Sequence, residues 1–120
     1  MKRKKILKLL GLQGNINVIV GDAVEVLPTI NKKYDMIFID ASKGKYSVFF
    51  EHALRLSNSG SVIIADNVLY RGYVMGDYNE RKYRTVVNRL RKFIEEVTTN
   101  KKVKTEILEV GDGLAVSVVK

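Results

Sequence analysis

Acidic and amide side chains follow two apolar runs of the sequence. Asp40 comes directly after residues 36–39, and Asp66 and Asn67 come directly after residues 62–65. If the runs are neighbouring parallel strands, their carboxyl ends meet at a crevice where such sheets bind ligands. Oxygen ligands there suit Mg²⁺, or alternatively Ca²⁺ or Mn²⁺, and the lack of nearby histidine or cysteine disfavours zinc. Both aspartates could instead cap the segments that follow them, and spacing alone does not decide between the two roles.

Three further polar side chains could take part in chemistry. Lys43 follows Asp40 by three residues, so its amine could act as a general base, although a solvated lysine is the commoner outcome. Asp22 precedes a helical segment, where it could bind a nucleotide amine but is more often a helix cap. His52 has no acidic or hydroxyl partner at a suggestive spacing, and we assign it no catalytic role.

These side chains need strands and helices to position them. Residues 34–40 and 61–65 have the apolar composition of strands covered on both faces. Between them, residues 46, 49, 50, 53 and 54 recur at helical spacing, and residues 58–60 predict the end of that helix. The order strand, helix, strand predicts a βαβ unit with parallel strands. A further strand is predicted over residues 15–20, followed by a helix that Pro28 makes short or irregular.

The second half of the chain predicts a long loop, a helix and a hairpin. Residues 68–82 lack periodicity and carry tyrosine, glycine and charge, which indicates a surface loop. Apolar residues from Val86 to Val97 recur at helical spacing and predict a long amphipathic helix. Residues 103–110 and 114–119 flank Gly111-Asp112-Gly113, so we expect an antiparallel hairpin closing the sheet.

Composition limits the class of protein. A chain of 120 residues, 46% of them hydrophobic, can bury one modest core, and without cysteine it has neither disulfides nor a thiolate site. The apolar stretch near the N-terminus is too short to span a membrane, and we interpret it as the remnant of an amphipathic helix. We therefore expect a cytoplasmic protein without a membrane partner.

Basic residues are clustered. The 21 basic and 13 acidic residues leave a net charge of +8, and residues 71–104 carry ten basic against four acidic side chains. RNA or a phosphorylated substrate would fit this charge, although a solvated lysine-rich surface explains it as well. Aromatic and basic side chains that alternate in this region could stack on unpaired bases and neutralise phosphates, or could only pack the loop: Tyr70, Arg71, Tyr73, Tyr78, Arg81, Tyr83 and Arg84.

Several motifs occur in the order found in one family of enzymes. The chain resembles the metal-dependent S-adenosylmethionine O-methyltransferases of the catechol and caffeoyl-CoA type. The resemblance covers nearly the whole chain and rests on Gly21-Asp22-Ala23, Leu27-Pro28, Tyr34-Asp35-Met36-Ile37-Phe38-Ile39-Asp40-Ala41-Ser42-Lys43-Gly44-Lys45-Tyr46, Asp66-Asn67-Val68-Leu69 and Gly111-Asp112-Gly113-Leu114. Within the family, residues 69–74 look most like the bacterial branch that methylates 5-hydroxyuridine at the tRNA wobble position.

The resemblance implies a fold and a set of roles. The fold would be an α/β, Rossmann-like class I methyltransferase sheet with a C-terminal antiparallel hairpin, in one partial domain over residues 1–120. By resemblance Asp40, Asp66 and Asn67 are metal ligands, Lys43 is the general base, Asp22 and Ala23 contact the adenine of S-adenosylmethionine, and Asp40 and Ala41 border its methionine end. In the tRNA interpretation, Tyr70, Arg71, Tyr73 and Arg84 would bind the substrate.

The chain also departs from the family pattern. We expect it to lack the first two strands, the glycine-rich loop and the N-terminal helices, so that on its own it binds the cofactor weakly or not at all. Loss of neighbouring strands would expose the edges of the strand over residues 16–20, and we expect a homodimer or strand exchange to cover them. The acceptor could be tRNA or a small catechol-like phenol, and a third possibility is an inactive fragment or half of a split enzyme.

Overall fold

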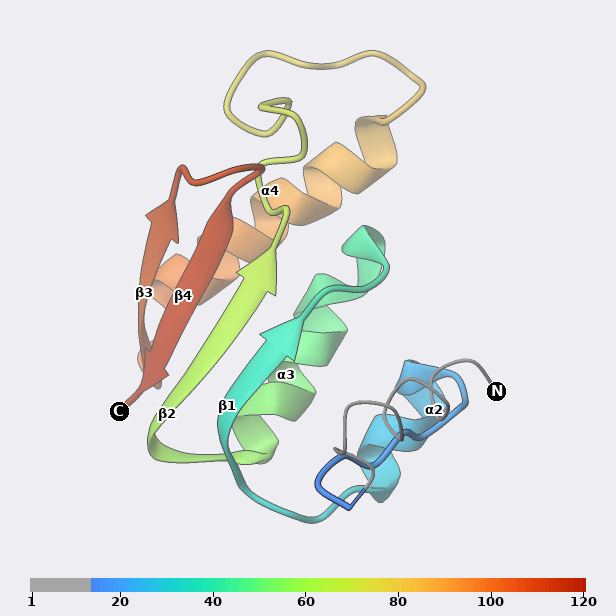
Figure 1. Cartoon of the computed structure of the whole chain (residues 1–120). Coiled ribbons are helices and arrows are strands. Elements are labelled where there is room, and N and C mark those ends of the chain that lie inside the picture. Colours follow the sequence, from blue (N-terminus) through green and yellow to red (C-terminus); the bar gives the residue numbers. More distant parts are fainter. Residues whose placement is uncertain (1–13) are drawn as a thin grey trace.

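A mixed four-stranded sheet forms the centre of the molecule (Figure 1). The structure is a computed structural model that describes residues 14–120. The strands β1 (Tyr34–Ile39), β2 (Ser57–Asp66), β4 (Leu114–Val119) and β3 (Val103–Leu108) lie in that order. Strands β1 and β2 are parallel, whereas β4 is antiparallel to both β2 and β3. The predicted βαβ unit and C-terminal hairpin are confirmed, and the predicted N-terminal amphipathic helix lies outside the described residues.

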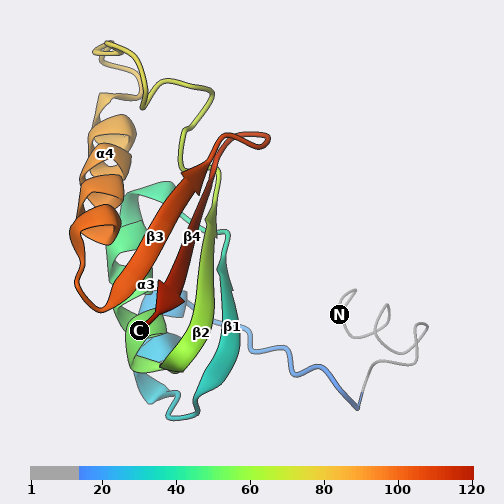
Figure 2. The ribbon, with the colours of Figure 1, turned by 90° about the vertical axis from the view of Figure 1, so that its left-hand side faces the viewer.

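Two helices cover one face of the sheet. Helices α3 (Tyr46–Arg55) and α4 (Arg84–Thr99) lie side by side against it, and no helix within residues 14–120 lies on the opposite face (Figure 2). Both helices were predicted from their apolar spacing, which places one stripe of each against the sheet. The ring of Phe93 meets the edges of the Tyr46 and Phe50 rings at centroid distances of 5.5 and 5.8 Å. The buried residues of the two helices are Tyr46, Phe49, Phe50, Ala53, Val87, Leu90, Phe93 and Val97.

The turn between α3 and β2 differs from the prediction. The helix ends at Arg55, and β2 begins at Ser57, so residues 58–60 belong to the strand instead of ending the helix. The hydroxyl of Ser57 donates a hydrogen bond to the carbonyl of Ala53 at 2.6 Å and satisfies a group freed at the helix end. Gly60, with a φ of +90°, lies in an irregular stretch where the β1–β2 register shifts. Glycine therefore marks a bulge here and not a helix stop.

The strand predicted over residues 15–20 is not formed. Residues 16–20 have no regular secondary structure, and the side chains of Ile19 and Val20 are 61% and 69% exposed. A strand requires a hydrogen-bonding neighbour, and no strand in the described part of the chain pairs with this segment. After it come the short helix α2 (Ala23–Val26) and a 3₁₀ turn over Leu27–Thr29, as Pro28 predicted.

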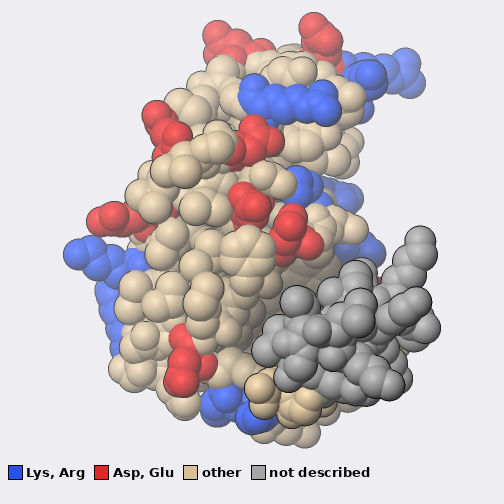
Figure 3. Space-filling view, in the orientation of Figure 1, with Lys and Arg blue, Asp and Glu red and all other residues tan. Residues whose placement is uncertain are grey.

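The prediction that the first parallel strand is covered on both faces is wrong. Met36 and Phe38 are 60% and 53% exposed, because both helices pack on the other side of the sheet. Their register partners Val62 and Ile64 continue the same surface. Figure 3 looks onto this side and shows a broad uncharged area over the strands. We call this surface the open sheet face; its apolar members are Met36, Phe38, Val62, Ile64, Leu108, Val116 and Val118.

The segment between β2 and α4 is a loop, as predicted. Residues 67–83 contain turns but no helix or strand. Its first residues are not at the surface, however, since Val68 and Leu69 are buried in the core. None of the helices within residues 14–120 has the length and apolarity needed to cross a membrane.

Candidate active site at the carboxyl end of the parallel strands

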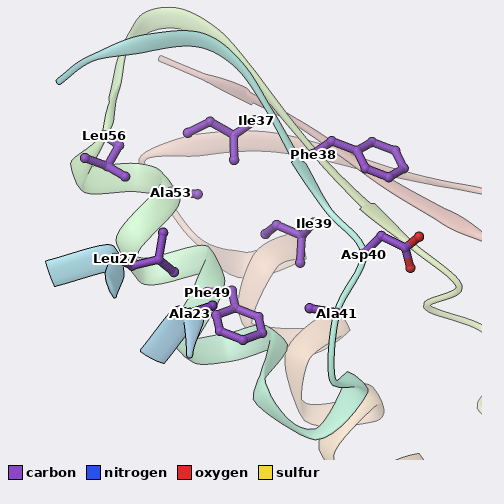
Figure 4. A pocket seen from close by; sticks show the side chains of 10 residues that line it. All are labelled: Ala23, Leu27, Ile37, Phe38, Ile39, Asp40, Ala41, Phe49, Ala53 and Leu56. Atoms are coloured by element: carbon purple, nitrogen blue, oxygen red, sulfur yellow. The ribbon is translucent and has the colours of Figure 1, made fainter. Parts of the chain in front are cut away.

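The two predicted aspartates meet at one end of the sheet. Ile39 and Ala65 are register partners in β1 and β2, so Asp40 and Asp66 follow at adjacent positions. Paired strands lie about 4.8 Å apart, which brings both residues to the same edge. The side chain of Asp40 is 55% exposed and points away from the apolar residues below it (Figure 4). The two residues thus lie at the same edge of the sheet, as expected from parallel pairing, and their binding of a metal stays a prediction.

The carboxylate of Asp66 uses one of its two oxygens in a local hydrogen bond. One of its carboxylate oxygens accepts a hydrogen bond from the backbone N–H of Asn67 at 2.7 Å. This hydrogen bond fulfils the capping role that the sequence suggested. The second carboxylate oxygen does not take part in it. Asn67 has a φ of +58°, a left-handed conformation that asparagine tolerates better than most residues. The chain therefore turns sharply at the strand end, directly after Asp66.

The donor set fits a hard divalent cation. It consists of two carboxylates and one amide, which are oxygen ligands of the kind that Mg²⁺ binds while retaining several waters. Within residues 14–120 no group of three or more His, Cys, Asp or Glu side chains is placed to hold a metal ion, so the site has fewer protein ligands than a closed structural zinc site. Asp40, Asp66 and Asn67 remain the residues that could ligate a cation.

Lys43 lies beside Asp40 and is linked through Tyr46 to the backbone of Asp66. It begins a 3₁₀ turn, Lys43–Lys45, directly before α3, and its ammonium is 3.9 Å from a carboxylate oxygen of Asp40. The same nitrogen lies 3.3 Å from the hydroxyl of Tyr46, which donates a hydrogen bond to the backbone carbonyl of Asp66 at 2.7 Å. Burial raises the pKa of Tyr46 above its ordinary value. The structure thus brings the predicted base to the predicted metal ligands.

An apolar cavity adjoins Asp40 on the helix side of β1. Its volume is about 220 Å³, smaller than the roughly 300–1,000 Å³ usual for complete small-molecule sites. Three of the four predicted cofactor residues, Ala23, Asp40 and Ala41, lie along it (Figure 4). The cavity suits one flat, apolar part of a ligand. Its other lining residues are Leu27, Ile37, Phe38, Ile39, Phe49, Ala53 and Leu56.

Asp22, the fourth predicted cofactor residue, caps α2. Its carboxylate accepts a hydrogen bond from the backbone N–H of Val24 at 2.9 Å. Because it directly precedes Ala23, it lies next to the cavity without lining it. The structure therefore gives Asp22 the capping role that the sequence favoured.

Four tyrosines of the loop form a cluster, which we call the tyrosine cluster: Tyr70, Tyr73, Tyr78 and Tyr83. The rings of Tyr73 and Tyr78 are stacked at 4.3 Å, and Tyr70 meets Tyr73 and Tyr83 edge-on at 6.0 and 5.7 Å. The guanidinium of Arg71 lies 6.0 Å from the ring centre of Tyr83. Three of the four predicted substrate residues thus come together, but their rings pack largely on one another.

Arg84, the fourth predicted substrate residue, does not join the tyrosine cluster through its charged group. Its guanidinium donates two hydrogen bonds to the carbonyl of Asn79, at 2.8 and 3.2 Å. Arg84 is also the first residue of α4. Its side chain thus connects the end of the loop to the first residue of α4.

Two cations lie beside Tyr83 in the tyrosine cluster. A hydrogen bond from Lys82, together with the positive charge of that residue, lowers the pKa of the Tyr83 hydroxyl below its ordinary value. The ammonium of Lys82 also lies 5.1 Å from the ring centre of Tyr83. The exposed surface of the cluster therefore presents a phenol that ionises early beside two cations, Lys82 and Arg71.

Two residues that hold the loop were missed by the sequence analysis. The carboxylate of Asp112, in the β3–β4 turn, accepts a hydrogen bond from the backbone N–H of Arg71 at 2.7 Å. Arg91, in helix α4, donates to the carbonyls of Tyr73, Val74 and Gly76. No local pattern indicates either contact, because the partners lie far apart in the chain.

Comparison with known proteins agrees with this geometry. A family model described as O-methyltransferase matches residues 2–120. The chain is 37% identical to a catechol O-methyltransferase of Niastella koreensis, with 92% of this chain and 52% of that protein covered. It is 32% identical to tapetum-specific methyltransferase 1 of Arabidopsis thaliana, with 92% and 50% covered. The chain thus spans about half the length of these curated relatives.

Solved structures show the same fold. An O-methyltransferase from Bacillus cereus in complex with SAH has a TM-score of 0.84 and 32% identity, with 98% of this chain and 56% of that chain covered. The O-methyltransferase TomG from Streptomyces achromogenes, in complex with SAM, has a TM-score of 0.85 and 29% identity, with 97% and 55% covered. The Rossmann-like methyltransferase fold expected from the resemblance is therefore confirmed.

Proposed function

The chain belongs to the S-adenosylmethionine-dependent O-methyltransferase family of the catechol and caffeoyl-CoA type, and from this premise we propose that it serves cation-assisted transfer of a methyl group to a hydroxyl oxygen. One observation carries the proposal. Asp40, Asp66 and Lys43 converge at the carboxyl end of two parallel strands, directly beside the apolar cavity.

We assign the roles in the reaction as follows. Asp40, Asp66 and Asn67 would hold a divalent cation, which when bound supplies a Lewis acid for the acceptor hydroxyl. The amine of Lys43 would accept the proton that this hydroxyl loses. Holding acceptor and methyl donor in one orientation removes much of the entropic barrier to their reaction.

S-adenosylmethionine is the methyl donor in this proposal, and when bound it supplies the methyl group of its sulfonium. Relatives bound to SAM and SAH support this assignment. Ala23 lies along the apolar cavity, whose size and lining suit an adenine ring, and Asp22 stands beside it. Asp40 and Ala41, at the aspartate end of the cavity, would border the methionine part.

A phenolic hydroxyl is our first candidate for the acceptor. Relatives named for catechol and caffeoyl-CoA favour it. Our second candidate is 5-hydroxyuridine of tRNA, favoured by a specific observation: the cations of Arg71 and Lys82 lie against the tyrosine cluster, in the strongly basic second half of the chain. In the tRNA case Tyr70, Arg71, Tyr73 and Arg84 contact the substrate.

Cofactor binding tests the first step of this function. In calorimetric titration with S-adenosylhomocysteine and Mg²⁺, we expect weak but saturable binding, because the apolar cavity holds only part of a complete site. The variant Ala23→Phe fills the cavity and should weaken it, whereas Glu25→Phe, on the same short helix but outside the cavity lining, should not. Folded protein that binds no cofactor, or equal affinity in the two variants, would contradict the assignment.

Acceptor choice is tested separately. Radiolabelled methyl transfer is measured to a catechol and, in parallel, to tRNA that carries 5-hydroxyuridine. Transfer to the catechol alone supports the phenolic acceptor, and transfer to tRNA alone supports the nucleotide. Transfer to neither by protein that binds the cofactor would contradict both candidates.

A further inference from the structure

Tyr46 links the candidate base to a metal-ligand strand, and we propose that it is a positioning residue for Lys43. The catalytic part of this inference rests on the proposed function. The contacts do not depend on it: the buried hydroxyl of Tyr46 contacts the nitrogen of Lys43 and the backbone carbonyl of Asp66 at the end of β2.

Tyr46 occupies a core position at which an apolar ring would fit equally well. The side chain is only 1% exposed, and its ring packs edge-on against Phe93 at 5.5 Å. Phenylalanine would fill the same space without burying a polar atom. Burying a hydroxyl costs free energy unless it is hydrogen-bonded, so its two polar contacts must offset that cost.

The direction of both hydrogen bonds follows from the groups involved. The backbone carbonyl of Asp66 can only accept, so the phenol must donate its single hydrogen at 2.7 Å. A lone pair of the same oxygen then faces the nitrogen of Lys43 at 3.3 Å.

This arrangement suits a residue that exchanges a proton. A lysine nitrogen carries N–H groups both as an ammonium and as a neutral amine, so it can donate to Tyr46 in either state. The hydrogen bond can therefore hold Lys43 before and after proton transfer. Without it, the polar contact that remains to Lys43 is Asp40 at 3.9 Å, which is too long for a hydrogen bond.

The contact also ties two elements together. Lys43 lies in the turn after β1, whereas the carbonyl of Asp66 ends β2. Tyr46 is the first residue of α3, and its ring is held by α4 through Phe93. The position of the base is thus fixed relative to both strand ends that carry the metal ligands.

The decisive variant is Tyr46→Phe, with Tyr34→Phe on β1 as the control. In a methyl-transfer assay we expect Tyr46→Phe to lower kcat about ten- to hundredfold, as for a misplaced catalytic group, with KM for both substrates nearly unchanged. Lys43→Ala should lower kcat further than Tyr46→Phe, and the double variant should match Lys43→Ala alone. Wild-type kcat in Tyr46→Phe, or a fall caused by KM alone, would overturn the proposal.

A second measurement does not depend on activity. In NMR spectra of wild-type protein, the Tyr46 hydroxyl proton should exchange slowly with water and show a contact to the terminal methylene of Lys43. In Tyr46→Phe the Lys43 side chain should become as mobile as the exposed Lys101. If wild-type protein transfers no methyl group but these signals are seen, the proposed function fails while the link stands. Lys43 signals as mobile in the wild type as those of Lys101 would overturn the link itself.

Discussion

At the scale of single residues, the two aspartates differ in what surrounds them. Asp40 is largely open to solvent, and the ammonium of Lys43 lies 3.9 Å from its carboxylate. Asp66 is half-buried and uses one oxygen to hold the N–H of Asn67. Asp66 is therefore the better fixed of the two, and removal of its carboxylate should have the clearer effect on cation binding.

We expect Asp66→Ala to weaken Mg²⁺ binding at least about tenfold, because loss of a ligand should cost no less than loss of its outer-shell partner. Calorimetric titration with Mg²⁺ measures this directly. Asp77→Ala, which removes an exposed carboxylate from the loop, serves as the control and should bind normally. Unchanged Mg²⁺ affinity in Asp66→Ala would refute the ligand assignment.

Tyr83, whose pKa is lowered, should ionise before Tyr46 and Tyr78, whose pKa values are raised by burial. Lys82 lowers its pKa by hydrogen bonding and by charge. Since the folded state favours the phenolate, the stabilising contribution is present above the unfolded pKa and is lost as the pH falls through the lower folded pKa. At neutral pH the phenol is protonated in both states, and the contribution vanishes.

Tyrosinate absorbance during a pH titration measures this order. The earliest phase should disappear in Tyr83→Phe and move to higher pH in Lys82→Gln. Lys101→Gln removes an exposed lysine remote in sequence from the tyrosine cluster and should leave that phase in place. An unchanged early phase in Lys82→Gln would show that Lys82 does not cause the shift.

At the scale of elements, the β3–β4 turn supports the loop that follows β2. Val68 and Leu69 donate backbone hydrogen bonds to the carbonyls of Gly113 and Asp112 at 3.2 and 3.0 Å. Gly113 has a φ of +91°, and a Cβ there would lie 2.9 Å from the Cβ of Leu69. Close approach of the two backbones therefore requires glycine at this position.

Gly113→Ala should destabilise the fold more than Gly60→Ala. Both positions have a φ near +90°, so both alanines are strained, at about 1–3 kcal/mol. A Cβ on Gly60 meets no atom within 4 Å, whereas the one on Gly113 strikes Leu69 and adds overpacking of about 1–3 kcal/mol. Urea unfolding of both variants measures the difference. Equal loss of stability would mean that Leu69 moves aside freely.

The strand ends and the two long helices could be predicted from short-range patterns in the sequence. Apolar runs ending in Asp40 and Asp66 identified two strand ends, and parallel pairing then required the carboxylates to meet. Helical spacing likewise identified α3 and α4. The strand predicted over residues 15–20 was wrong, because β-branched residues form a strand only where a neighbour supplies hydrogen bonds.

Contacts between distant segments were beyond such reasoning. Asp112 and Arg71 are 41 residues apart, and nothing near either residue indicates that they meet. The polar contacts of the Tyr46 hydroxyl could not be predicted for a different reason. Its ring fits the apolar stripe of α3, so its polar function emerges only when the end of β2 is placed beside it.

At the scale of the whole molecule, β1 is an edge strand with an apolar surface. No strand within residues 14–120 pairs with its outer side, so its outward backbone groups can pair with another chain. Its side chains Met36 and Phe38 belong to the open sheet face. We therefore expect the homodimer predicted from the sequence to form at β1.

A two-fold axis at Ile37 would pair two β1 strands in antiparallel fashion. In that register Met36 lies opposite the partner's Phe38, a favourable sulfur–aromatic pair, and the contact is repeated by symmetry. We expect light scattering at micromolar concentration to give the mass of a dimer, and Met36→Lys to give that of a monomer. Met75→Lys is the matched control, because Met75 is exposed to the same 60% as Met36 but lies in the loop. Circular dichroism must show both variants to be folded. A monodisperse wild-type monomer would refute the dimer, and equal dissociation by both lysines would place the interface away from β1.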